Sequence, residues 1–389
     1  MLVGILKRLG ADEVHEAANG TDALDIIERL DQAVDIIVSD LDMPEMDGME
    51  LMRHLGDSNT PSSLIIASSM DQPLVRAVVK MATAYRINLL GSVDKPPSPD
   101  ILLQLIESHD ARKNQHRSSR GPSLQFRLEE IEAGLDNGQF EPFFQPKVSL
   151  DSGRVLGLEA LARWRHPEHG VLPPFVFIEE IEDGGLIDKL TRAMIERATA
   201  WCKTWRDQDL DVAVAINISI HTLTQVGLAE RLTRYVIEQG LEPRHVTLEV
   251  TETVAMTDLG RVLENLSRLR MKGFMIAIDD YGTGYSSMQQ LDRTAATELK
   301  IDRSFVTGAG KQKSSRVILQ SSLEMAARLG LTSVAEGVET LADWNLLSEF
   351  GCDQAQGYFI ARPMAAEEVA EWIKNWHTDG RHELPVQAG

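Results

Sequence analysis

The stretch FMIAIDD, residues 274–280, holds the pattern that decides the fold: an apolar run that ends in two carboxylates. Six further apolar runs between residues 155 and 360 end in a carboxylate, an amide or a lysine. They are VLGLE ending at Glu159, VAVAIN at Asn217, VTLEVTE with Glu249 and Glu252, ELK at Lys300, SVAE at Glu336 and CDQAQ at Gln356. Each run predicts a buried strand. Because helix-like sequence follows most of them, the pattern indicates a repeated βα unit.

Repeated strand ends of this kind predict where function collects. In a parallel TIM-like (β/α)8 barrel, every strand delivers its last residue to the same mouth. Polar residues that are far apart in the sequence then meet in one pocket. A mouth with five or six carboxylates cannot leave them all charged and unpaired, so the pattern predicts bound divalent cations.

The composition favours a cytoplasmic protein of two domains. The chain has 389 residues, of which 43% are hydrophobic, and two cysteines. No apolar stretch approaches the ~18–20 residues of a membrane span, and the first residues do not resemble a signal peptide. The formal net charge of −20 repels DNA, RNA and anionic membranes, but it permits a small phosphorylated ligand if bound metals invert the local field.

The polar, locally basic segment 107–123 is the only convincing linker and ends in Gly121-Pro122. It separates an α/β pattern over residues 1–106 from the barrel-like region over residues 124–376. A short polar tail follows at residues 377–389, and we expect it to be mobile.

The first domain carries a strand-end carboxylate followed by a loop with proline and glycine. The segment VDIIVSDLDMPEMDG, residues 34–48, places Asp40 there, while LIIASS ends near Ser68 and SVDKPPS presents Lys95. Together these motifs resemble a response-regulator receiver domain, a doubly wound parallel sheet. The resemblance implies that Asp40 accepts a phosphoryl group, that Ser68 contacts it, and that Lys95 is its counter-charge. A sensor histidine kinase is the implied partner.

Two features depart from the receiver pattern. The chain opens on what should be the first helix, GILKRLG, so the family's first strand and the acidic pair at its end are missing. That strand is central in the strand order 2-1-3-4-5, so its loss would leave its two neighbours, one of them predicted at residues 12–18, unpaired. The expected explanations are a start upstream of Met1, a degraded domain, or completion by another segment. Ser92 also replaces the usual aromatic residue.

The second domain contains an ordered series of motifs. They are GLEALARWRHP at 157–167, NIS at 217–219, LEVTET at 248–253, DDYGTGYSS at 279–287, LKID at 299–302, AEGVET at 335–340 and QGYFIARP at 356–363. This series resembles the EAL-domain family of cyclic-di-GMP phosphodiesterases. The resemblance implies hydrolysis of cyclic di-GMP to linear pGpG with two Mg²⁺ or Mn²⁺ ions per site. We further expect a homodimer or higher oligomer, with dimerisation as the route by which the receiver tunes activity.

The EAL resemblance assigns a role to each strand-end residue. The implied metal ligands are Glu159, Asn217, Glu249, Asp279, Asp280 and Glu336. The implied catalytic residues are Lys300, Glu336, Gln356 and Glu159, with Lys300 and Gln356 acting on the attacking water, and the implied substrate contacts are Arg163, Gln145 and Asp302. Glu252 is implied to steady the DDYGTGYSS loop, in which Gly282 and Gly284 permit movement.

Competing interpretations remain open at this point. Singly, Glu159, Glu249 or Glu336 could be a salt-bridge partner at a barrel rim, although one such residue at each strand end disfavours that reading. The main alternative functions are a non-catalytic cyclic-di-GMP receptor and a signalling scaffold on the same barrel. Receptors of this type lose metal ligands or the lysine, whereas every expected position is filled here. No GGDEF-type cyclase motif is present in the sequence.

Overall fold

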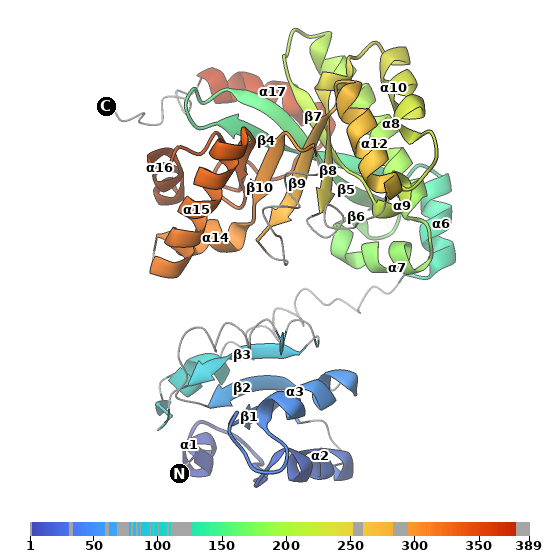
Figure 1. The fold of residues 1–389 in the computed structure, drawn as a ribbon. Helices are drawn as coiled ribbons and strands as arrows, with labels where there is room; N and C mark the ends of the chain where they lie inside the picture. The colour runs from blue at the N-terminus through green and yellow to red at the C-terminus, as the bar shows by residue number, and fades with distance from the viewer. Residues whose placement is uncertain are drawn as a thin grey trace. The chain divides into compact units, whose positions relative to one another are not determined.

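A computed structural model of the protein divides it into two compact units, Met1–Leu124 and Gln125–Gly389 (Figure 1). The structure describes residues 2–30, 34–58, 62–67, 78, 81–82, 85, 87–93, 95, 97–99, 101–106, 109, 126–251, 260–282, 295–310 and 312–378. Within these residues, no helix combines the length and the apolar character that crossing a bilayer requires.

The described residues of the first unit form a parallel three-stranded sheet in the order β1-β2-β3. Its strands are β1 Ile36–Ser39, β2 Ser63–Ala67 and β3 Asn88–Val93. The helices are α1 Leu2–Arg8, α2 Gly20–Arg29 and α3 Gly48–Asp57. Side chains alternate along β2, so Ile65 joins one buried cluster with Ile5 of α1, while Leu64 joins another with Met52 of α3. The sheet is therefore covered on both faces, as in a doubly wound domain.

The strand predicted at residues 12–18 is not formed, so that prediction is wrong. This segment has no regular secondary structure, and its residues are mostly exposed. In the doubly wound order this strand pairs only with the central strand that was expected and is not among the described residues. A strand without a ladder partner leaves its backbone groups to water, so local β propensity alone does not hold the segment extended.

Within its described residues, the second unit is a closed barrel of eight strands. The short strand β6 pairs with the last residues of β5. The strands are β4 Phe140–Ser149, β5 Val155–His166, β6 Gly170–Leu172, β7 Ala213–Asn217, β8 Val246–Thr251, β9 Met275–Tyr281, β10 Glu298–Ile301, β11 Thr332–Ala335 and β12 Gln354–Ala355. They follow the order β4-β12-β11-β10-β9-β8-β7-β5, and pairing of β4 with β5 closes the ring. The predicted TIM-like architecture is confirmed.

Two details differ from the expected parallel barrel. The eighth strand, β4, is antiparallel to both of its neighbours, β5 and β12. The strand predicted to end at Glu159 instead continues to His166, because β4 pairs with it from Val148↔Val155 to Phe140↔Trp164. Glu159 therefore lies within a strand rather than at its end.

Helices surround the barrel strands (Figure 1). They are α6 Leu128–Asp136, α7 Ile178–Asp183, α8 Ile187–Arg206, α9 Ile220–Leu223, α10 Leu228–Glu238, α12 Gly260–Met271, α14 Arg303–Ala309, α15 Lys313–Leu329, α16 Leu341–Glu349 and α17 Ala366–Thr378, with short 3-10 turns at Pro174–Val176 and Pro243–His245. The long helix α8 turns Ala198, Cys202 and Trp205 inward, where they are at most 1% exposed. Trp205 packs edge-on against Phe144 of β4, which ties the antiparallel strand to the helical layer.

Candidate active site

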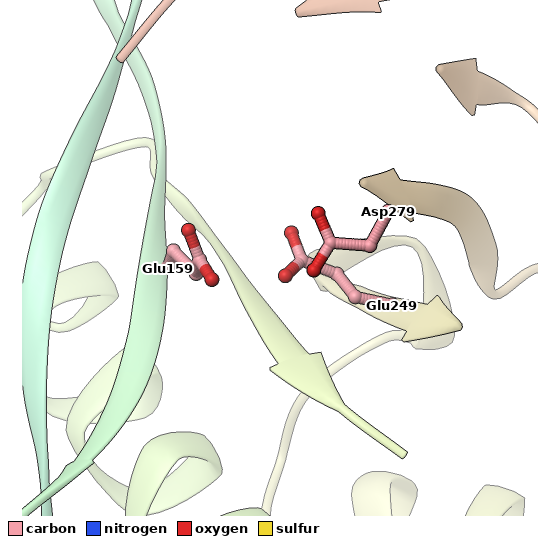
Figure 2. A group of neighbouring side chains, drawn as sticks. All are labelled: Glu159, Glu249 and Asp279. Carbon is pink, nitrogen blue, oxygen red and sulfur yellow. The ribbon is translucent and has the colours of Figure 1, made fainter. Parts of the chain in front are cut away.

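The polar residues at the barrel mouth converge on one lysine. Lys300 of β10 is 1% exposed, and its Nζ lies 2.8 Å from Asp279 Oδ1, 2.8 Å from Glu336 Oε1, 3.0 Å from Glu249 Oε2 and 3.4 Å from Glu159 Oε2. Figure 2 shows that the carboxylates of Glu159, Glu249 and Asp279 face one another from three different strands. One buried ammonium group thus meets four carboxylates.

Amide side chains complete this cluster. Asn217, the last residue of β7, donates from Nδ2 to Glu159 Oε1 and to Glu249 Oε2, both at 3.4 Å. Gln356, which follows β12, donates from Nε2 to Glu159 Oε2 at 2.5 Å and to Gln145 Oε1 at 3.0 Å. Gln145 of β4 in turn donates to the carbonyl of Ala361 at 2.9 Å. These bonds fix the orientation of both Glu159 oxygens.

Burial and charge crowding shift the pKa values in this cluster in opposite directions. Burial raises the pKa of Glu249 well above its ordinary value, and the charge of Glu159 adds to the effect. Burial also raises the pKa of Glu336 to about 8, with Asp279 and Glu159 contributing. Burial acts to raise the pKa of Glu159, but the charge of Lys300 and the hydrogen bond from Gln356, with a smaller effect of Lys147, together outweigh it and lower the pKa. Burial alone would lower the pKa of Lys300, but the surrounding carboxylates hold it well above its usual range, so this lysine stays protonated.

The carboxylates fall into two groups that could each hold a cation. Ligand oxygens of Glu159, Glu249 and Asp279 all lie within 4.8 Å of one another, and so do those of Asp279, Asp280 and Glu336. Asp279 belongs to both groups. Glu249 Oε1 is buried and has no hydrogen-bond partner among the described residues. Hard oxygen donors, an orphaned carboxylate oxygen and an excess of negative charge fit Mg²⁺ or Mn²⁺.

Arg163 and Asp302, the predicted substrate contacts besides Gln145, lie around this cluster. Arg163 of β5 is half-buried, and it donates to the carbonyl of Ala162 at 2.8 Å rather than to a cluster carboxylate. Asp302 caps α14 by accepting from the Ser304 amide at 3.0 Å. Its charge, after burial and the charge of Asp279, helps to raise the pKa of Asp280.

The loop that follows β9 begins with a glycine that no other residue could replace without strain. Gly282 has φ +102°, and an added Cβ would lie 2.3 Å from the Phe305 ring. Glu252 and Gly284, both predicted to act through this loop, lie outside the described residues.

The receiver unit has a smaller charged site. Asp40 follows β1, and its Oδ2 is paired with Lys95 Nζ, while Oδ1 accepts from the Asp42 amide at 3.3 Å. Burial acts to raise the pKa of Asp40, but the hydrogen bond from Lys95 and the backbone amides outweigh it and lower the pKa. The loop after Asp40 ends at Gly48, which approaches the Asp40 backbone closely. An added Cβ at Gly48 would lie 2.2 Å from the Asp40 carbonyl oxygen, so a larger residue does not fit there. Ser68 lies outside the described residues.

Two buried charged residues were missed by the sequence analysis. Lys147 of β4 and Glu298 of β10 are 3% and 7% exposed, and their side chains pair at 2.6 Å. A signal was available in the sequence, because each interrupts an apolar strand, in FFQPKVSL and in ATELKID. Without the strand order, nothing in the sequence joins the two.

Comparison with known families agrees with this geometry. A family model for the EAL domain matches residues 128–363, and a model for the response regulator receiver domain matches residues 1–107. The EAL match alone covers more than half of the chain.

Individual proteins and solved structures are similar to this chain in sequence and in fold. Cyclic di-GMP phosphodiesterase RocR of Pseudomonas aeruginosa is 36% identical over 95% of this chain and 94% of its own length. A solved structure titled as the PaMucR phosphodiesterase in complex with c-di-GMP is 37% identical, with a TM-score of 0.60, and covers 62% of this chain and 98% of that one. The EAL domain of Mycobacterium smegmatis DcpA is 30% identical, with a TM-score of 0.53, and covers 61% of this chain and 98% of that one.

Proposed function

Since the chain belongs to the EAL-domain family and carries a response-regulator receiver domain before it, we propose that it is a metal-dependent phosphodiesterase that hydrolyses cyclic di-GMP to linear pGpG. The observation that carries this proposal is the convergence of four carboxylates on Lys300 at the barrel mouth. The relatives named as cyclic di-GMP phosphodiesterases support the same substrate.

The metal-binding roles follow from the two carboxylate groups. Glu159, Asn217, Glu249 and Asp279 would hold one divalent ion, and Asp279, Asp280 and Glu336 would hold a second. A pair of Mg²⁺ or Mn²⁺ ions supplies an activated water and stabilises the charge that develops on an in-line phosphodiester transition state. Asp279 is common to both groups, and the adjacent Asp280 would extend the ligand set towards the second ion.

The remaining residues orient the water and the substrate. Lys300 can donate hydrogen bonds from its ammonium group, so its proposed role is to hold and orient the attacking water. Gln356 is held by Glu159 and Gln145, which fixes its amide for the same task. Arg163 provides a planar guanidinium for a substrate phosphate. Gln145 and Asp302 are the further proposed substrate contacts.

The receiver unit is proposed to control this activity. Asp40 is the proposed phospho-acceptor, with Lys95 as its counter-charge and Ser68 as a contact to the phosphoryl group. The proposed boundaries are residues 1–106 for the receiver, 107–123 for the linker, 124–376 for the EAL domain and 377–389 for the tail. A sensor kinase would supply the phosphoryl group, and dimerisation would carry the signal. Acetyl phosphate should label the wild-type chain but not Asp40→Asn, and it should change pGpG formation only in the wild type.

An assay for pGpG formation tests the proposed activity. Purified protein is incubated with cyclic di-GMP and Mg²⁺ or Mn²⁺, with EDTA in a parallel sample, and the nucleotides are separated by chromatography. Metal-dependent appearance of pGpG is the expected result. Binding of cyclic di-GMP without turnover at any metal concentration would favour the receptor alternative, and absence of binding would favour the scaffold.

A further inference from the structure

A second charged pair lies in the barrel interior directly beneath the proposed metal site. Lys147 pairs in register with Gly157, two residues before Glu159 on β5, and Glu298 lies two residues before Lys300 on β10. Residues two apart on a strand face the same side, so this pair lies one layer below the carboxylate cluster.

Lys147 lies closer to one of its two neighbouring carboxylates than to the other. Its Nζ lies 2.6 Å from Glu298 Oε1 but 3.9 Å from Glu249 Oε1, which is beyond hydrogen-bond distance. That Glu249 oxygen is the buried atom without a hydrogen-bond partner among the described residues, whereas Glu249 Oε2 is engaged by Lys300. Lys147 is thus within ion-pair distance of Glu249 Oε1, yet it lies too far away to donate a hydrogen bond to it.

Glu249 is the alternative partner for the Lys147 ammonium group. A lysine side chain is long and flexible, and a buried ammonium group without a partner moves towards the nearest carboxylate. If Glu298 did not hold Lys147, the nearest carboxylate would be Glu249. An ammonium group bound to Glu249 Oε1 would then compete with a metal ion for the same oxygen.

We propose that Glu298 is a positioning residue for metal binding: it anchors Lys147 beneath the site and so keeps Glu249 Oε1 available as a ligand. This inference rests on the proposed metal-dependent function. It differs from a purely structural role for the pair, in which loss of Glu298 would weaken folding but leave metal affinity unchanged.

A double-mutant cycle on the full-length chain tests the proposal. Glu298→Gln, Lys147→Met and the double variant are stripped with EDTA, and Mn²⁺ binding is measured from the free-ion electron paramagnetic resonance signal. We expect Glu298→Gln to raise the Mn²⁺ dissociation constant about 10-fold, as loss of outer-shell support does at other metal sites. In the Lys147→Met background the same change should alter it less than about 2-fold, because the competing ammonium group is gone.

The matched control is Glu141→Gln, the same chemical change in the partly exposed Glu141–Arg165 pair of the same barrel. Thermal unfolding monitored by circular dichroism identifies any variant that does not fold. Wild-type Mn²⁺ affinity in Glu298→Gln, or an equal loss with and without Lys147, would overturn the proposal. Failure of the wild-type chain to bind Mn²⁺ would overturn the proposed function as well, so the two failures are distinguishable.

A structural measurement covers the case in which Lys147→Met does not fold because Glu298 is left buried without a partner. A crystal structure of metal-free Glu298→Gln should place Lys147 Nζ within about 3.2 Å of Glu249 Oε1. A lysine that remains as far from this oxygen as in the wild type would overturn the proposal.

Discussion

Asp40 in the receiver unit and the carboxylates around Lys300 in the barrel are both strand-derived acids paired with a lysine, but they differ in burial and in number. The Asp40 and Lys95 side chains are 25% and 47% exposed and pair one to one. Lys300 is 1% exposed and faces four carboxylates. An exposed pair is nearly neutral and contributes little to stability, whereas a buried excess of negative charge is costly unless bound protons or cations compensate it. The comparison therefore explains why a divalent metal is expected in the barrel.

The largest effect is expected from removing the central lysine of the barrel. Lys300→Ala should lower the rate of pGpG formation by roughly 10²–10⁴-fold, because the attacking water loses its oriented donor. Cyclic di-GMP should still bind, which calorimetry would measure. Lys189→Ala, which removes an exposed lysine paired with Asp136, is the control and should retain wild-type turnover. Near-normal activity of Lys300→Ala would contradict its proposed role.

Removing one barrel carboxylate should have the next largest effect. Glu159→Gln keeps the volume of the side chain but removes a charged metal ligand, so the Mn²⁺ dissociation constant should rise by at least about 10-fold. Titration of EDTA-stripped protein with Mn²⁺ measures this change. Glu141→Gln on the neighbouring strand is the matched control. Equal Mn²⁺ affinity in the two variants would show that Glu159 is only a salt-bridge partner.

The raised pKa values of Glu249 and Glu336 predict that the metal-free barrel loses stability as pH rises. Both groups are protonated in the folded state at a pH where the unfolded chain has already lost those protons. The contribution of Glu336 is fully present below the ordinary value of 4.5 and is lost as pH rises towards about 8, and that of Glu249 changes in the same direction. In EDTA, the unfolding temperature should fall by roughly 2–5 °C per pH unit between pH 6 and 8.

A matched variant and added metal sharpen the pH prediction. Glu336→Gln removes one of the two titrating groups and should flatten the dependence. Saturating Mn²⁺ should flatten it too, since metal binding favours ionised carboxylates. An unfolding temperature that is constant over this pH range in EDTA would contradict the assignment.

The smallest effect is expected at the exposed pair. Asp40→Asn should change the free energy of unfolding of the receiver unit by less than about 1 kcal/mol, because solvent screens the ion pair with Lys95. Urea denaturation of the full-length chain, followed by a probe in the receiver unit, measures this change. A larger loss would mean that Asp40 stabilises the loop up to Gly48 and that the two sites are more alike than their exposure indicates.

Secondary structure was easiest to predict where the described residues hold the ladder partners of an apolar run. The runs that contain Asn217, Glu249 and Lys300 became β7, β8 and β10, because their neighbours in the ring complete their ladders. Residues 12–18 did not become a strand, and no strand that pairs with them lies among the described residues. The antiparallel strand β4 was not among the predicted runs, because it precedes the βα repeat and follows none of its spacing.

The sequence by itself determined which chemistry the barrel mouth offers, because polar residues in or just after the apolar runs of such a barrel reach the same mouth. Only the tertiary structure decided how these groups are shared. It placed Lys300 among four carboxylates and gave Glu249 one satisfied oxygen and one without a partner among the described residues. It also paired Lys147 with Glu298 across 151 residues of sequence. Contacts of this kind depend on strand order and register, which arise from the closed ring of hydrogen bonds and not from any local segment.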